Sequence, residues 1–218
     1  MSTHVKIDFV SDVSCPWCVI GLRELETALA RFGPALEVEF AFQPFELNPQ
    51  MPPAGQDLDE HIMEKYGMAP GDTAQTREGI RARGAALGFE FRMDRRSRIY
   101  NTFDAHRLLA WSASHGRQGE LKRALFEVYF TRGENPGARD VLLAAAAAVG
   151  LDVEGAQAVL DSDAYAEEVR ERERFYHANG IHAVPAVILN DRHLVQGGQP
   201  AEVFEQVLRE VTAVGAQA

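Results

Sequence analysis

The sequence has only two cysteines among its 218 residues, too few for the disulfide framework of a small secreted domain. No stretch approaches the roughly 18 consecutive apolar residues of a membrane-spanning helix, and the N-terminus lacks the basic and apolar regions of a signal peptide. Basic side chains are also scarce, 22 against 32 acidic ones. We therefore expect a cytoplasmic protein that binds neither membranes nor nucleic acid.

What the chain does contain is typical of a folded protein. Hydrophobic residues make up 46% and charged residues 25% of the sequence, which suits a globular core with a solvated surface. No fixed internal period is present, so a repeat architecture is excluded. The length favours one elaborated domain, or a domain with an insertion, and we expect a monomer or a homodimer.

Both cysteines lie in the segment SCPWC, as Cys15 and Cys18. The preceding segment 4–10 alternates apolar residues as a strand does, and segment 18–33 repeats them at the spacing of a helix. Segment 36–47 then reads as a second strand. The pattern predicts a parallel βαβ unit with Cys15 at the N-terminus of its helix.

This position gives the two thiols different predicted roles. Residues three apart on a helix share a face, which puts Cys15 and Cys18 within disulfide reach. Pro16 suits a first helical turn because its missing N–H would be unpaired there anyway. The positive end of the helix dipole stabilises a thiolate at Cys15, so we expect Cys15 to be the nucleophile. Cys18, one turn further in, would resolve the mixed disulfide that Cys15 forms with a substrate.

Two other interpretations of the cysteine pair remain open. The pair could be half of a zinc site completed by His177 and His182, although structural zinc usually prefers a knuckle to a helix start after a strand. The cysteines could also be inert buried residues, although Pro16 and Trp17 are bulky choices for a site that only packs. A redox pair is favoured over both, and we expect no bound metal.

The C-terminal part of the sequence predicts a ββα unit. Segments 186–190 and 193–197 are short strands, and a helix follows from Pro200. Pro185 stands directly before the first of these strands. It either simply begins that strand or carries a cis bond after Val184.

Four segments from the beginning, middle and end of the chain together carry a family resemblance: FVSDVSCPWCVIG, FELNPQMP, NTFDAHRLLAW and AVPAVILNDRHLVQGGQPAEVFEQVL. A βαβ unit with C-x-x-C opening its helix, followed by ββα with Val-Pro before its first strand, resembles the thioredoxin fold. More narrowly, the chain resembles the DsbA-like oxidoreductases of the FrnE type. The glutathione-using kappa-class transferases and hydroxychromene-carboxylate isomerases form a related branch, but they carry serine where this chain has Cys15.

The resemblance implies a fold, a function and a site. The fold would be α/β, a thioredoxin fold (βαβ…ββα) with a large inserted helical domain. Cys15 would attack, Cys18 would resolve, and Pro185 would be a cis-proline that lines the substrate groove together with Val184 and Trp17. The substrates would be protein or small-molecule thiols and disulfides.

The middle of the chain predicts the insertion. Several segments between residues 50 and 175 repeat apolar residues at helical spacing, and most of them end in glycine. We expect a thioredoxin-like domain at residues 1–50 and 176–218 and a helical domain at 51–175. The charges of segment 163–180 are expected to form a solvated helix face.

Three further residues are candidates for a supporting role around the cysteines. Trp17 is expected to be exposed beside the disulfide as an apolar surface for substrates. Asp12 could cap the helix or accept a proton, with Asp8 as a nearby competitor, and capping is favoured. His106 either packs on its helix or lines the redox groove.

Two function classes therefore stay open. The first is a thiol–disulfide oxidoreductase or isomerase that works through the Cys15–Cys18 disulfide and needs no other cofactor. The second is a glutathione-dependent transferase or isomerase of a small molecule. The intact cysteine pair favours the first, because activating bound glutathione needs only one thiol or hydroxyl; glutathione could still serve as a co-substrate.

Overall fold

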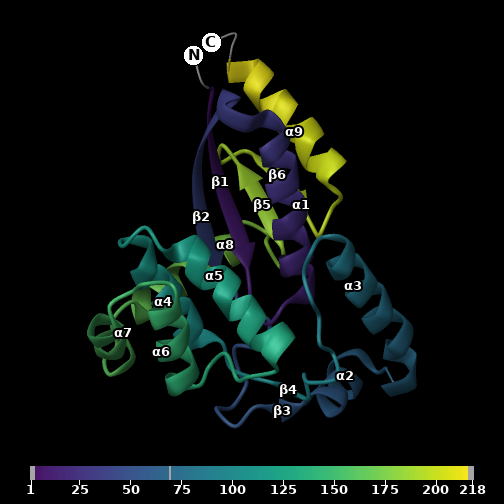
Figure 1. Ribbon diagram of the computed structural model, residues 1–218, viewed down its shortest axis with the longest axis vertical. Coiled ribbons are helices and arrows are strands. Elements are labelled where there is room, and N and C mark those ends of the chain that lie inside the picture. The colour runs from purple at the N-terminus through teal and green to yellow at the C-terminus, as the bar shows by residue number, and fades with distance from the viewer. Residues whose placement is uncertain (1–2, 69, 216–218) are drawn as a thin grey trace.

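The computed structural model describes residues 3–68 and 70–215 of the chain. Its central sheet has four strands in the order β2-β1-β5-β6 (Figure 1). The elements that build this half of the molecule are β1 (Thr3–Ser11), α1 (Pro16–Phe32), β2 (Leu36–Pro44), β5 (Ala186–Leu189), β6 (His193–Gln196) and α9 (Ala201–Gly215). The expected βαβ and ββα units are confirmed.

Strand β1 lies in the middle of the sheet and is buried along most of its length. It pairs in parallel with β2, with Ile7 opposite Phe40 and Phe9 opposite Phe42, and antiparallel with β5. The Phe9 ring contacts the Phe42 ring edge-on at 5.7 Å between centroids. The sequence of β1 alternates polar and apolar residues, and its odd positions Val5, Ile7 and Phe9 are fully buried.

Helices cover both faces of the sheet. Helices α1 and α9 pack against each other on one face, together with Val5, Ile7 and Phe9. On the opposite face, Tyr176 of α8 (Ala166–Ala178) packs with Val10. Side chains alternate across a strand, so even and odd positions of β1 serve two different layers.

The segment between β2 and β5 is mainly helical. Its elements are β3 (Gln56–Asp57), α2 (Leu58–Tyr66), α3 (Ala74–Ala86), β4 (Arg98–Ile99), α4 (Phe103–Ala113), α5 (Gln118–Glu127), α6 (Arg139–Ala148), α7 (Val153–Leu160) and α8. A π-helical segment, Val128–Arg132, continues α5. The helices α4 to α7 share a second apolar core, which includes Leu108, Leu125 and Leu142.

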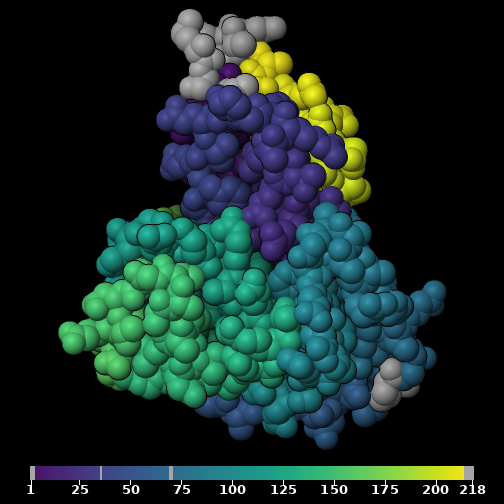
Figure 2. Space-filling model, in the orientation of Figure 1, coloured from purple at the N-terminus to yellow at the C-terminus, as the bar shows by residue number. Residues whose placement is uncertain are grey.

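The two halves meet at the N-terminal end of α1. Figure 2 shows the sheet half as the narrower upper part of the molecule and the helical segment as the broader lower part. Val13, in the loop before α1, packs into the helical core, whereas Phe126 and Tyr129 belong to the core of the sheet half. The cysteine motif therefore lies at the junction of both cores.

The structure departs from the sequence predictions in four places. Helix α7, which Asp152 caps by accepting a hydrogen bond from Gly155 N at 2.8 Å, and the β3–β4 ladder were not predicted. The expected domain boundary at residue 175 falls inside α8, and the independence of the helical domain stays a prediction. The charges of α8 are not all solvated, because Glu173 is buried.

Candidate active site

Cys15 is the N-cap residue of α1, and Pro16 opens its first turn, as predicted. The side chain of Cys15 is 3% exposed and that of Cys18 is fully buried. Both are free thiols in this structure. No side chain caps the helix, so its free N–H groups and the positive end of its dipole lie at Cys15.

The segment before β5 lies against the thiol of Cys15. Cys15 Sγ donates to the carbonyl oxygen of Val184 at 3.6 Å, and the Val184–Pro185 bond is cis. Val184 lines the groove described below, whereas Pro185 is buried and is not among the lining residues. Its ring packs beneath α1 instead, where a Cβ on Gly21 would come within 2.9 Å of Pro185 Cγ. Of the two residues expected here, Val184 lines the groove, whereas the expectation that Pro185 does so is wrong.

A groove with a volume of about 760 Å³ opens beside Cys15. Its walls come from the start of α1, the loop after β2, the helices α2 and α3, and the segment that ends at Val184. Trp17 lines it and is 38% exposed, so the predicted exposure of this side chain is confirmed. Cys15 belongs to the lining of the groove and Cys18 does not.

The groove carries positive side chains in a protein with a formal net charge of -10. Lys65, Arg77 and Arg96 line it, and the lining includes a single carboxylate, that of Glu46, among the residues that the structure describes. Lys65 Nζ donates to Leu47 O and Asn48 Oδ1. In the described parts of the chain, no carboxylate lies within ion-pair distance of Lys65 or Arg96.

Behind the cysteines, Asp12 is almost fully buried. Its carboxylate accepts hydrogen bonds from Ser14 N at 3.2 Å, Ser14 Oγ at 3.0 Å and Leu47 N at 2.8 Å. The prediction that Asp12 caps α1 is wrong, because the chain turns at Cys15 and the carboxylate points inward. It ties the loop after β2 to the loop before α1 instead.

Asp12 shares this interior with His106 of α4 and Lys122 of α5. His106 Nε2 lies 3.5 Å from Asp12 Oδ1, an ion-pair contact, and has no well-aligned hydrogen-bond partner in the described part of the chain. Burial opposes ionisation of Asp12, but the attraction of His106 and Lys122 outweighs it and lowers the pKa of the carboxyl. His106 does not line the groove, so it lies behind the cysteine motif.

Lys122 is fully buried. Its Nζ lies 3.5 Å from Ser11 O and 5.1 Å from the centroid of the Phe126 ring. Burial lowers the pKa of Lys122 to about 8, although the charges of Cys18, Asp12 and Cys15 favour the ammonium form. Burial and the nearby Cys15 raise the pKa of Cys18 well above its ordinary value, and the charge of Lys122 opposes this.

A second buried cluster links the groove to α8. Arg170 of α8 pairs with Glu46 and Glu173 and stacks on the ring of Phe103 at 3.8 Å from its centroid. Within the described residues, one carboxylate oxygen of each glutamate has no hydrogen-bond partner. Burial and the charge of Glu173 raise the pKa of Glu46 to about 7.

The histidine pair weighed as zinc ligands lies at the groove without forming a metal site. His177 and His182 stack at 5.9 Å between ring centroids and both line the groove. Among the residues that the structure describes, no three histidine, cysteine or carboxylate side chains are grouped so that they could hold a metal ion. The geometry gives the zinc interpretation no support.

Sequence reasoning missed Lys122, Glu46 and the cations of the groove. A signal for Lys122 existed, because residues 122, 126 and 129 fall on one helical face and the other two are phenylalanine and tyrosine. A lysine on such a face is buried unless it reaches out of the core. Glu46 carried no comparable signal, because it lies in a loop.

A family model described as "DSBA-like thioredoxin domain" matches residues 6–209. The chain belongs to this family. It is a family of thiol–disulfide oxidoreductases that act on thiol and disulfide substrates, which agrees with the recognition of the fold from the sequence. No described helix is both long and apolar enough to cross a membrane.

Solved structures of DSBA-like proteins resemble the chain over most of its length. A probable DsbA oxidoreductase from Streptomyces coelicolor is 35% identical, with a TM-score of 0.89 over 95% of this chain and 89% of that one. A 2-hydroxychromene-2-carboxylate isomerase is 14% identical, with a TM-score of 0.73 over 97% and 98%. The cytosolic disulfide reductase DsbM from Pseudomonas aeruginosa, solved with glutathione, is 19% identical, with a TM-score of 0.61 over 94% and 98%. The last two likenesses show the fold alone.

Proposed function

We propose that the protein catalyses dithiol–disulfide exchange in the cytoplasm, with Cys15 as the attacking thiol and Cys18 as the resolving thiol. The observation that carries the proposal is the asymmetry of the pair. Cys15 lines the groove at a helix N-terminus, whereas Cys18 is enclosed one turn further in. The two cysteines form the only redox group that the reaction needs.

The proposed reaction has two steps. The thiolate of Cys15 attacks one sulfur of a substrate disulfide, and the other substrate sulfur leaves as a thiolate that takes a proton from solvent. The deprotonated sulfur of Cys18 then attacks Cys15 Sγ, which releases the second substrate sulfur and leaves a Cys15–Cys18 disulfide. Run in reverse, the same steps oxidise a substrate dithiol. Isomerisation of a protein disulfide uses only the first step and its reverse: Cys15 attacks one substrate disulfide, and another thiol of the substrate then displaces Cys15.

The two cysteines can be tested with a matched pair of variants. Cys15→Ser should abolish reduction of a small disulfide, because no attacking thiol remains. Cys18→Ala should keep the first attack and accumulate the mixed disulfide, which mass spectrometry of the intact protein detects. Iodoacetamide at mildly acidic pH should label Cys15 at least about tenfold faster than Cys18, as expected for a thiol that lines the groove at a helix N-terminus against a shielded one. Faster labelling of Cys18 would reverse the two roles.

The cations of the groove favour glutathione as one of the substrates. Glutathione is a small thiol with a net negative charge, and Lys65 and Arg96 have no carboxylate partner in the described structure. The similar fold of DsbM, which was solved with glutathione, is compatible with this choice of substrate. If the protein is instead a glutathione-dependent isomerase or transferase, Cys18→Ala should retain full turnover.

A further inference from the structure

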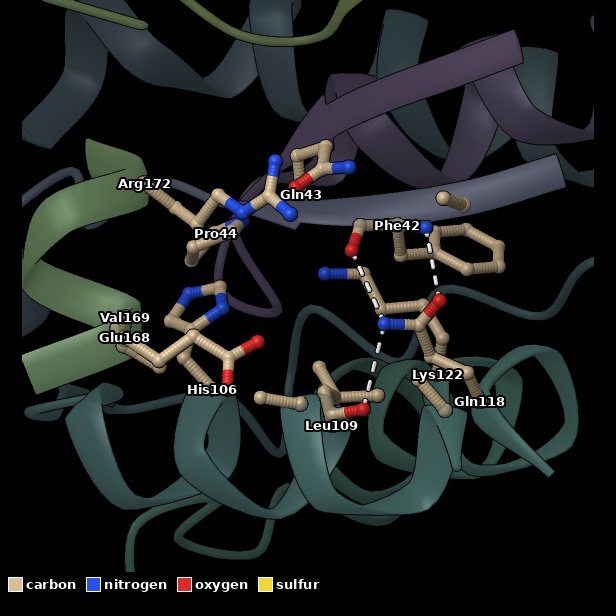
Figure 3. A pocket seen from close by; sticks show the side chains of 13 residues that line it. Phe42, Gln43, Pro44, His106, Leu109, Gln118, Lys122, Glu168, Val169 and Arg172 are labelled. Carbon is tan, nitrogen blue, oxygen red and sulfur yellow. Dashed lines mark hydrogen bonds between the residues drawn. The ribbon is translucent and has the colours of Figure 1, made fainter. Parts of the chain in front are cut away.

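A second cavity of the protein is separate from the groove at Cys15. It has a volume of about 160 Å³ and is bounded by β2, α4, α5 and α8. Among the described residues, none lines both the cavity and the groove. Figure 3 shows the cavity with Arg172 and His106 on one side and Gln118 and Lys122 on the other. A protein cavity of about 150 Å³ can hold benzene, so this space suits a small guest.

Lys122 borders this cavity with most of its hydrogen-bonding capacity unused. An ammonium group has three N–H donors, and this side chain is fully buried. Within the described chain, Nζ makes a single hydrogen bond, to Ser11 O at 3.5 Å, and no carboxylate lies within ion-pair distance. Its pKa of about 8 keeps the ammonium form in the majority at neutral pH. A buried cation with idle donors needs a further partner.

His106 places a second buried nitrogen group at the same cavity. It is 2% exposed, and Nε2 has no well-aligned hydrogen-bond partner among the residues that the structure describes. Its ion-pair contact with Asp12 Oδ1 spans 3.5 Å. Two incompletely bonded groups, from α4 and α5, therefore line one cavity. Such groups are explained by bound water or a bound ion.

The rim of the cavity adds a third cationic group. Arg172 of α8 is exposed and makes no ion pair with a described carboxylate. The rim also carries the carboxylate of Glu168, in solvent, where salt screens its charge. The amide of Gln118 is already used, because it accepts from Phe42 N at 2.9 Å and donates to Phe42 O at 3.0 Å. The groups left for a guest favour an anion.

The remaining walls decide which class of anion fits. They are largely apolar and include Phe42, Leu109, Ala110 and Ala113. Phosphate has oxygens on every side, and those that face apolar walls would lose their hydrogen bonds with water at a high cost. A carboxylate carries its charge at one end only, and the hydrocarbon at its other end suits apolar walls.

From these contacts we propose that the cavity is a binding site for a small organic carboxylate. The carboxylate group meets Lys122 and His106, and the hydrocarbon part, no larger than benzene, lies against the apolar walls. Arg172 attracts the anion to the mouth of the cavity. The site goes beyond the exchange reaction proposed above, because neither cysteine lines it.

The charges around His106 imply that binding takes up a proton. Asp12 contacts His106, and Lys122, Glu168 and Arg172 line the cavity with it. These four groups carry two negative and two positive charges, so they cancel when His106 is neutral. A bound carboxylate adds one negative charge, which a protonated His106 offsets. The imidazolium then donates from both ring nitrogens.

Calorimetric titration with butyrate tests the site. Butyrate should bind the unaltered protein, and butyramide, a neutral analogue of nearly the same shape, should bind at least roughly tenfold more weakly. This is the lower range for loss of a hydrogen bond to a charged group. Inorganic phosphate should also bind more weakly than butyrate. Titrations in two buffers with different heats of ionisation should show uptake of about one proton.

Three variants test the residues that meet the carboxylate. Lys122→Met removes the charge, keeps a side chain of similar length, and should weaken butyrate binding roughly tenfold or more. Lys65→Met, in the groove, is the matched control and should leave butyrate binding unchanged. His106→Gln should abolish proton uptake, because glutamine does not titrate. Urea unfolding curves establish that each variant is folded.

A blocking variant tests the cavity with Lys122 and His106 in place. Ala110→Phe fills the cavity and should abolish butyrate binding. Ala147→Phe, at an exposed position of α6, is its control and should bind butyrate as the unaltered protein does. This pair of variants decides the question if Lys122→Met does not fold.

Each contrary result overturns a defined part of the proposal. Butyrate binding that persists in Ala110→Phe places the anion elsewhere. Equal binding of butyrate and butyramide removes the role of charge, and tighter binding of phosphate removes the carboxylate class. No binding of butyrate at tens of millimolar means that the cavity holds water only. Disulfide exchange takes no part in these titrations, so their outcome is independent of the function proposed above.

Discussion

The groove at Cys15 and the cluster behind Cys18 lie on opposite sides of one helix N-terminus. They differ in whether their charged side chains are open to a ligand or enclosed with groups of opposite charge. In the groove, Lys65 and Arg96 have no carboxylate within ion-pair distance among the residues that the structure describes. The cluster encloses Asp12 and Lys122 together, out of solvent. Open cations attract a charged substrate, whereas enclosed groups of opposite sign balance each other's charge. In the proposed reaction, the groove would therefore attract the substrate to Cys15, and the cluster would balance charge behind Cys18.

The largest expected effect comes from removing the carboxylate of the enclosed cluster. Asp12→Ala leaves Lys122 buried without its counter-charge and should lower the free energy of unfolding by about 3–5 kcal/mol at neutral pH. Asp94→Ala, which breaks the exposed pair with Arg92, should cost less than about 1 kcal/mol. Urea titrations measure both.

The Asp12 effect has a defined pH dependence. Its folded-state pKa lies below the ordinary 3.8, so its ionised form contributes stability above that value, and the contribution is lost as the pH falls through the folded pKa. The difference between Asp12→Ala and the unaltered protein should therefore shrink in strong acid. Equal differences at neutral and strongly acidic pH would contradict an ionised Asp12.

The next largest effect concerns Glu46, where a buried carboxyl borders the open groove. Its pKa is raised from 4.5 to about 7, so the stability of its protonated form is present below 4.5 and is lost as the pH rises through about 7. Glutamine stays neutral at every pH, so Glu46→Gln avoids the cost of ionising a buried carboxyl. The variant should be more stable than the unaltered protein by about 2 kcal/mol at high pH. The gain should vanish in mild acid.

A control for Glu46 lies on the exposed side of α5. Glu127→Gln, at an exposed position, should change the free energy of unfolding by less than about 0.5 kcal/mol at either pH. Thermal unfolding followed at several pH values makes the comparison. A Glu46→Gln gain that does not depend on pH would mean that packing, rather than titration, governs this carboxyl.

The smallest expected effect tests the open cations of the groove. Lys65→Gln should lower kcat/KM for glutathione disulfide roughly fivefold, which corresponds to about 1 kcal/mol of lost charge attraction. The rate with neutral hydroxyethyl disulfide should stay unchanged. Added salt should reduce the difference. Lys6→Gln, on β1 and paired with Asp8 and Asp191, is the control and should affect neither substrate. Equal losses with both disulfides would mean that Lys65 shapes the groove instead of attracting charge.

Local patterns were enough to predict the sheet half and the position of the motif. The apolar alternation of β1, the helical spacing after Cys18 and the place of Pro16 are each short-range signals. They fix Cys15 at a helix N-terminus without knowledge of any partner. The helical nature of the middle segment was predicted in the same way, although α7 and the β3–β4 ladder were not.

The roles of single buried side chains were harder to predict. Asp12 is of a residue type that often caps helices, yet its carboxylate accepts a hydrogen bond from Leu47 N across the junction of the two halves. Pro185 and Val184 were both expected at the groove, yet only Val184 lines it and the ring of Pro185 packs under α1. Each depends on the exact approach of another segment, and residue spacing does not reveal that approach.

The sequence by itself determined that this protein carries a C-x-x-C pair at the start of a helix in a βαβ unit, because strand and helix periods are local properties of the chain. The thioredoxin fold was implied by the family resemblance. Only the tertiary structure decided what surrounds the pair. Lys122 lies 111 positions from Ser11, whose carbonyl its Nζ contacts, and His106 comes from yet another helix. Periodicity shows that such residues are buried, but the packing of α4 and α5 against the sheet half determines which groups they meet.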